Sequence, residues 1–60
     1  MPKFYVKFVY KVKGLVKTWD GTYTTYSGAL NRYHFMRQRI ADWANNGYEL
    51  VTSELRRVEV

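Results

Sequence analysis

The chain contains few residues that could act as nucleophile, general base or metal ligand. His34 is its only histidine and cysteine is absent, so thiolate sites are excluded and a zinc site would lack ligands. A serine or threonine nucleophile would need His34 as its base, but helical spacing predicts that His34 faces solvent. The five carboxylates form no obvious pair for acid–base chemistry. We therefore expect a protein that is not an enzyme and that carries neither metal nor cofactor.

Lysine and aromatic side chains recur instead near the beginning of the chain. Positions 4, 6, 8, 10 and 12 read Phe, Val, Phe, Tyr, Val, whereas positions 3, 5, 7, 9, 11 and 13 read Lys, Tyr, Lys, Val, Lys, Lys. This period of two predicts a strand with one buried face and one basic face. The net charge of +5 also suits an anionic partner.

A basic face with aromatic side chains fits the binding of a nucleotide or nucleic acid. Aromatic rings stack on bases, while ammonium and guanidinium groups hold phosphates. Residues from the first strand, the hairpin and the last strand would contribute. The predicted ligand-binding residues are Tyr5, Lys7, Lys11, Lys13, Trp19, Tyr26 and Arg56.

Two other interpretations of the same pattern stay open. The lysines can belong to a solvated sheet face that opposes edge-to-edge association. Alternatively the surface can be a protein interface, with Trp19 beside the predicted turn as its anchor. Three helix arginines, Arg32, Arg37 and Arg39, would then cover the edges of the core or line a subunit junction.

The first part of the chain predicts a hairpin. We expect the first strand over 4–13, a bulge at Gly14, and a type I′ turn at Asp20-Gly21, because both turn residues tolerate positive φ. The segment 22–27 completes the hairpin. Ser27 then has the character of a helix N-cap.

The second part predicts a helix and a final strand. Between 29 and 45 the apolar residues adopt helical spacing, and Asn-Asn-Gly at 45–47 ends the helix with a left-handed residue. The tail 48–60 mixes two parities, which predicts a bulge near Ser53 or Glu54. The expected packing stripe of the helix consists of Ala29, Tyr33, Met36, Ile40, Trp43 and Ala44.

These elements predict one α+β domain over 1–60 with the order ββαβ. A right-handed crossover places the last strand beside the first, so the three-stranded antiparallel sheet has the order 2-1-3. One helix covers one face of this sheet and leaves the other face open.

Size predicts self-association. A chain of sixty residues buries only ~60% of its unfolded surface, and this chain has no disulfide to compensate. We therefore expect a homo-oligomer, most simply a dimer. The sequence has no run of eighteen apolar residues and no secretory pattern, which predicts a cytoplasmic protein without a membrane partner.

The segment "IADWANNGYELVTSEL", residues 40–55, resembles the end of a family of short uncharacterised bacterial and phage proteins. Their helix closes on a small-residue turn and continues into Gly-Trp-Glu-Leu-Val. Residues 47–51 match this motif, with Tyr48 in place of tryptophan, and "FYVKFVYKV" resembles the family's first strand.

In length and segment order the chain is also similar to small phage inhibitors of host enzymes. These resemblances imply a phage or mobile-element protein that counters a host defence pathway. Its ligand would be a nucleotide or nucleic acid held on the basic aromatic surface. The alternative is a host protein, bound through a sheet edge or an apolar patch.

Overall fold

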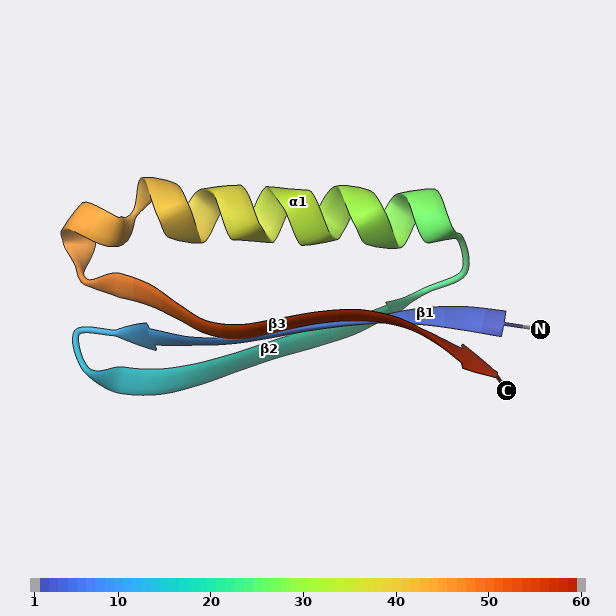
Figure 1. Cartoon of the computed structure of the whole chain (residues 1–60), viewed down its shortest axis with the longest axis horizontal. Helices are drawn as coiled ribbons and strands as arrows, with labels where there is room; N and C mark the ends of the chain where they lie inside the picture. Colours follow the sequence, from blue (N-terminus) through green and yellow to red (C-terminus); the bar gives the residue numbers. More distant parts are fainter. Residues whose placement is uncertain (1, 60) are drawn as a thin grey trace.

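The computed structural model describes residues 2–59 as one sheet with one long helix beside it (Figure 1). Val60, at the end of the predicted final strand, lies outside these residues. Strands β1 (Pro2–Val12) and β2 (Leu15–Tyr23) form a hairpin, helix α1 (Tyr26–Asp42) follows, and a short 3-10 turn η1 (Ala44–Asn46) leads into β3 (Tyr48–Glu59). Both pairings are antiparallel and the order is β2-β1-β3. The predicted α+β class, strand order and single covering helix are confirmed.

The hairpin turn lies at Lys13-Gly14, so the prediction of a turn at Asp20-Gly21 and a bulge at Gly14 was wrong. Lys13 and Gly14 have φ angles of 52° and 85°, and Val12 pairs with Leu15 across them, as in a type I′ turn. Turning here allows Phe4, Val6 and Phe8 to pair with β2. Asp20 and Gly21 lie inside β2 instead.

Gly21 has a packing role within β2. A Cβ atom at this position would lie 3.3 Å from the Cη2 atom of Trp19. That distance is tighter than ordinary van der Waals contact, so the missing side chain makes room for the Trp19 ring. An Asp-Gly pair in a sequence therefore does not always mark a turn.

Two local predictions also shift by a few residues. The helix N-cap is Thr25 rather than Ser27, and the Thr25 side-chain oxygen accepts a hydrogen bond of 3.2 Å from the N–H of Gly28. The bulge of β3 lies at Val51, because the register passes from Val9–Thr52 to Tyr10–Leu50. The predicted left-handed residue at the helix exit is confirmed, since Gly47 has φ 89°.

The core lies between β1 and α1. Val6, Phe8, Ala29 and Ile40 are its buried residues. The predicted helix stripe is confirmed for Ala29, Tyr33, Met36 and Ile40, which all belong to this cluster. The Tyr33 hydroxyl lies 2.8 Å from the Ser53 hydroxyl and ties the helix to β3. Between residues 2 and 59, no helix is long and apolar enough to cross a bilayer.

The left-handed turn generates a stability prediction. Nothing lies within 4 Å of a Cβ built on Gly14, so replacing it tests the backbone conformation alone. Gly14→Ala should lower the free energy of unfolding by about 1 kcal/mol, because alanine resists positive φ. Lys13→Asn should raise it by about 0.5 kcal/mol, because asparagine tolerates this region better than lysine. Urea unfolding measures both, and equal stability of the three chains would contradict this turn.

Candidate functional site

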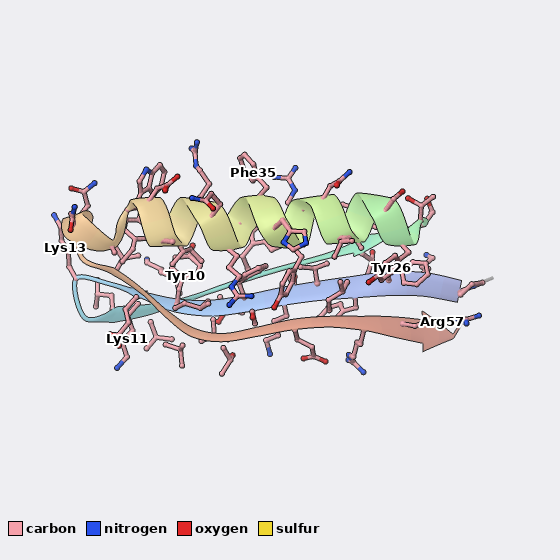
Figure 2. All side chains as sticks on the ribbon, turned by 45° about the horizontal axis from the view of Figure 1, so that its top comes forward. Tyr10, Lys11, Lys13, Tyr26, Phe35 and Arg57 are labelled. Carbon is pink, nitrogen blue, oxygen red and sulfur yellow. The ribbon has the colours of Figure 1, made fainter. Side chains whose placement is uncertain are left out.

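Four of the seven predicted binding residues share the open face of the sheet. Side chains alternate along a strand and residues paired across strands point to the same side, so Tyr5, Lys7 and Lys11 of β1 project away from α1 together with Arg56 of β3. Figure 2 shows Lys11 extending below the sheet, on the side opposite the helix. This part of the predicted surface is assembled as expected.

Carboxylates lie among these cations on the open face. Lys7 is paired with Asp20 on one side and Glu54 on the other. Lys11 is opposite Glu49, and the Nε atom of Arg56 lies 2.7 Å from a Glu54 carboxylate oxygen. The charged side chains of this face are Lys3, Lys7, Lys11 and Arg56 against Asp20, Glu49 and Glu54. The face therefore contributes only one of the five net positive charges.

The aromatic ring of the open face already has neighbours. The Tyr5 hydroxyl donates a hydrogen bond of 3.2 Å to Asp20, and the Arg56 guanidinium lies 5.1 Å from the centre of the Tyr5 ring. Partial burial on the sheet raises the pKa of Tyr5, and the negative charge and hydrogen bond of Asp20 raise it further, while Arg56 acts in the opposite direction. A base that stacks on Tyr5 would therefore have to share the ring with Arg56 or displace it.

The other three predicted residues lie elsewhere. Lys13 is in the hairpin turn, where its N–H donates to the Gly47 carbonyl at 2.9 Å. Trp19 lies on the helix side of β2, opposite Phe8, and packs against the core. Tyr26 begins α1 and meets the Phe4 ring edge-on at 5.6 Å. The structure does not bring these side chains to the open face.

A different cluster of basic and aromatic residues runs along one edge of α1. It consists of Arg32, Phe35, Arg39 and Trp43, spaced three or four residues apart, and is called the arginine–aromatic stripe below. The Arg39 guanidinium lies 5.4 Å from the centre of the Phe35 ring and 4.6 Å from that of Trp43. Arg32 reaches the Phe35 ring at 5.3 Å. The four side chains thus form a continuous chain of cation–π contacts.

The stripe is exposed and carries two guanidinium groups. Phe35 is 48% exposed and Trp43 is 38% exposed. Figure 2 shows Phe35 projecting from the outer surface of the helix. The only carboxylate in α1 is Asp42, outside the stripe, and it accepts a hydrogen bond of 2.9 Å from Gln38. Guanidinium groups that stack on rings keep their N–H edges available to an acceptor.

The stripe borders two hollows between α1 and the sheet. One hollow is lined by Tyr23 of β2 together with Gly28, Asn31, Arg32 and Phe35. A second follows along the helix, lined by Tyr10, Phe35, Met36, Arg39, Ile40, Trp43 and Tyr48. Phe35 lines both hollows, and each hollow is also lined by an arginine of the stripe.

Sequence reasoning placed the stripe residues in other roles. The arginines were expected to cover core edges or line a subunit junction, Trp43 was assigned to the packing stripe, and Phe35 had no role. The available signal was Phe35 itself, a large aromatic residue outside the apolar arc of the helix and within one turn of two arginines.

The remaining candidate chemistry is sparse. His34 is exposed, and its ring meets only the Tyr33 ring, 6.0 Å away edge-on, among the ring contacts of residues 2–59. In the same part of the chain, no three His, Asp or Glu residues gather as ligands for a metal. No family model matches the chain, and comparisons with curated proteins and with solved structures also find no match.

The open face yields a prediction about Tyr5. Because its pKa is raised, folding favours the neutral phenol, and this contribution to stability is lost as the pH rises through the folded-state pKa. Asp20→Asn should lower the pKa of Tyr5 by removing the charge and the ionic acceptor. NMR titration that follows a ring carbon of Tyr5 measures the pKa of Tyr5 in each variant. Asp42→Asn serves as the control, because Asp42 lies on the helix and does not contact Tyr5. An unchanged Tyr5 titration in Asp20→Asn would refute this contact.

Proposed function

We propose that this protein is a non-enzymatic, self-associating binding protein that holds nucleic acid on the arginine–aromatic stripe of α1. The supporting observation is the juxtaposition of two guanidinium groups with two exposed rings. Phosphates would accept hydrogen bonds from Arg32 and Arg39, and bases would stack on Phe35 and Trp43. This combination of positive groove and stacking platform is the one that single-stranded nucleic acid requires.

The length of the stripe favours an oligonucleotide over a single nucleotide. From Arg32 to Trp43 the helix rises roughly 16 Å, at about 1.5 Å per residue. A mononucleotide would contact only part of this length. Successive nucleotides of an extended strand can contact all four residues.

Charge distribution favours the stripe over the open sheet face. On the open face, Lys7 and Arg56 have carboxylates as direct neighbours, so a phosphate there competes with internal pairing. The stripe guanidiniums stack on rings instead. An anion approaching Arg32 or Arg39 therefore does not have to displace an acidic side chain of the stripe.

A charge-matched pair of double variants tests the location. Arg32→Gln/Arg39→Gln should weaken binding of a fluorescent dT12 strand at 50 mM salt by at least about tenfold, and should reduce the slope of log K against log salt by about 1.4, because two phosphate contacts are lost. Lys7→Gln/Lys11→Gln removes the same charge from the open face and should change binding far less. Fluorescence anisotropy between 50 and 200 mM salt gives both quantities. The reverse ranking would place the nucleic acid on the sheet.

A second substitution tests stacking apart from charge. Phe35→Ala should weaken dT12 binding by roughly 5- to 150-fold, the effect of losing one stacked base. The salt slope should stay unchanged. Phe35→Tyr keeps the ring and should bind like the unmodified chain. Equal affinities for the alanine and tyrosine variants would show that Phe35 stacks on no base.

The exposed edge of β2 favours a second candidate, the binding of a host protein by strand addition. Leu15 is 64% exposed and Val16 is 62% exposed there. A protein partner would pair with the strand backbone and would not need the stripe arginines. Failure to bind dT12 at either salt concentration, together with partner binding that survives Arg32→Gln/Arg39→Gln, would favour this candidate.

A further inference from the structure

The two edges of the sheet differ in how well they are protected. The β3 edge is interrupted by the bulge at Val51, and α1 packs more closely over β3 and β1 than over β2. Within the described chain, β2 pairs with β1 over nine residues without a register shift, and it contains no proline. Bulges, prolines and charged side chains are the usual means of preventing edge pairing. The β2 edge has neither bulge nor proline, and its only charged residues are Lys17 and Asp20.

The turn fixes which backbone groups of β2 face outward. A two-residue type I′ loop is closed by a hydrogen-bonded pair, here Val12 and Leu15, and such pairs alternate along an antiparallel ladder. The odd-numbered residues of β2 therefore direct their N–H and C=O groups toward β1. The even-numbered ones direct theirs to the free edge: Val16, Thr18, Asp20 and Thr22.

We infer that two copies of the chain pair through β2, antiparallel and centred on Trp19, so that their sheets join into one six-stranded sheet. This inference rests on the self-association included in the proposed function and identifies its surface. In this register the pairs between copies are Leu15 with Tyr23, Val16 with Thr22, Lys17 with Gly21, Thr18 with Asp20, and Trp19 with Trp19.

This register follows from length and charge. Trp19 is the midpoint of Leu15–Tyr23, so only this register pairs the whole strand. Centring on Lys17 would place two ammonium groups directly opposite, and centring on Asp20 would do the same with two carboxylates, both of which destabilise a sheet. Around Trp19 no like charges are opposed, and Thr18 gains the Asp20 carboxylate of the second copy as a hydrogen-bond acceptor.

The same pairing covers the most exposed apolar side chain. Leu15 projects to the helix side of β2, beyond the reach of its own helix. In the joined sheet Tyr23 of the second copy lies directly opposite it on the same side. Val16 is likewise paired with Thr22 on the open face. The exposed start of β2 thus becomes part of an interface.

Other surfaces are less suited to self-association. A twofold contact between two stripes would bring four arginines together and no acidic side chain. Stacking two open faces would bury seven charged residues from each copy, which costs desolvation. Edge pairing through β2 leaves both surfaces exposed to solvent and to ligand.

Pairing through β2 would also place the two helices side by side across the joined sheet. The Arg32–Phe35 half of each stripe lies toward β2, because these residues share a hollow with Tyr23, whereas Arg39 and Trp43 line a hollow with Tyr10 of β1 and Tyr48 of β3. With strands about 4.8 Å apart, the two helix axes would lie on the order of 20 Å apart. Helices of about 10 Å diameter would leave a gap of roughly 10 Å. Such a gap admits one extended nucleic-acid strand and excludes a duplex.

Two substitutions at one position test the interface. Thr18→Asp places two carboxylates opposite each other twice in the dimer and should raise the dimer dissociation constant at least tenfold. Thr18→Lys places an ammonium group there and should preserve or tighten the dimer. Sedimentation velocity from 1 to 300 μM measures the dimer dissociation constants of the two variants and of the unmodified chain. The unmodified protein should form a species of twice the 7.2 kDa mass of one chain. Circular dichroism verifies that each variant is folded.

Hydrogen exchange tests the β2 pairing on the unmodified chain, so that no substitution can disturb the fold. At dimer concentrations the amides of Val16, Thr18, Asp20 and Thr22 should be protected, and they should exchange quickly on dilution to monomer. A monomer at 300 μM, a dimer insensitive to Thr18→Asp, or unprotected even-numbered amides would each overturn the pairing. A chain that stays monomeric and binds a strand of another protein at β2 would also overturn the pairing.

Binding experiments separate this inference from the proposed function. Native mass spectrometry should find one dT12 strand per dimer, and one strand per chain would overturn the shared groove. The folded Thr18→Asp monomer keeps one stripe and should still bind dT12, more weakly. Loss of dimerisation with retained binding rejects only the interface, whereas a β2-paired dimer that binds no dT12 rejects only the nucleic-acid function.

Discussion

The structure depends on the position of β1 between two antiparallel neighbours and beneath a single helix. Val6 and Phe8 of this strand are fully buried against a helix face that supplies Ala29 and Ile40. This contact between β1 and α1 holds the sheet and the helix together. The partly buried side chains of the other strands pack at its periphery. The opposite side of β1 is left without a covering layer by the rest of the described chain, and its residues must remain compatible with water.

That constraint determines where positive charge has acidic neighbours within the chain. On the uncovered side, neighbouring strands place acidic residues beside the lysines of β1, so the face is solvated and almost neutral. Among residues 2–59 no element covers the outer side of the helix, and α1 carries three arginines against the single carboxylate of Asp42. Two of these arginines, Arg32 and Arg39, lie beside the exposed rings of Phe35 and Trp43 at the helix edge.

Periodicity and segment order made the fold and the strand order predictable, whereas the register between the strands could not be derived from the sequence. The alternation in 4–12 and the helical spacing from Ala29 to Ile40 each depend on one segment, and both predictions were confirmed. The turn was misplaced because Asp20-Gly21 has better turn chemistry than Lys13-Gly14, although only the latter aligns the core residues. The same error hid the carboxylate neighbours of Lys7 and placed Trp19 beside a turn, whereas the structure packs it against the core, so the candidate site could be predicted only in part.

The hydrogen bond between Lys13 and Gly47 joins the tip of the hairpin to the exit of the helix. A Cβ on Gly47 would lie 3.1 Å from the Lys13 side chain, so the two backbones meet as closely as a glycine permits. One end of the molecule is thereby closed by residues separated by more than half of the chain. The hydrogen bond therefore fixes the distance between the hairpin tip and the start of β3, and a side chain at position 47 would disturb both.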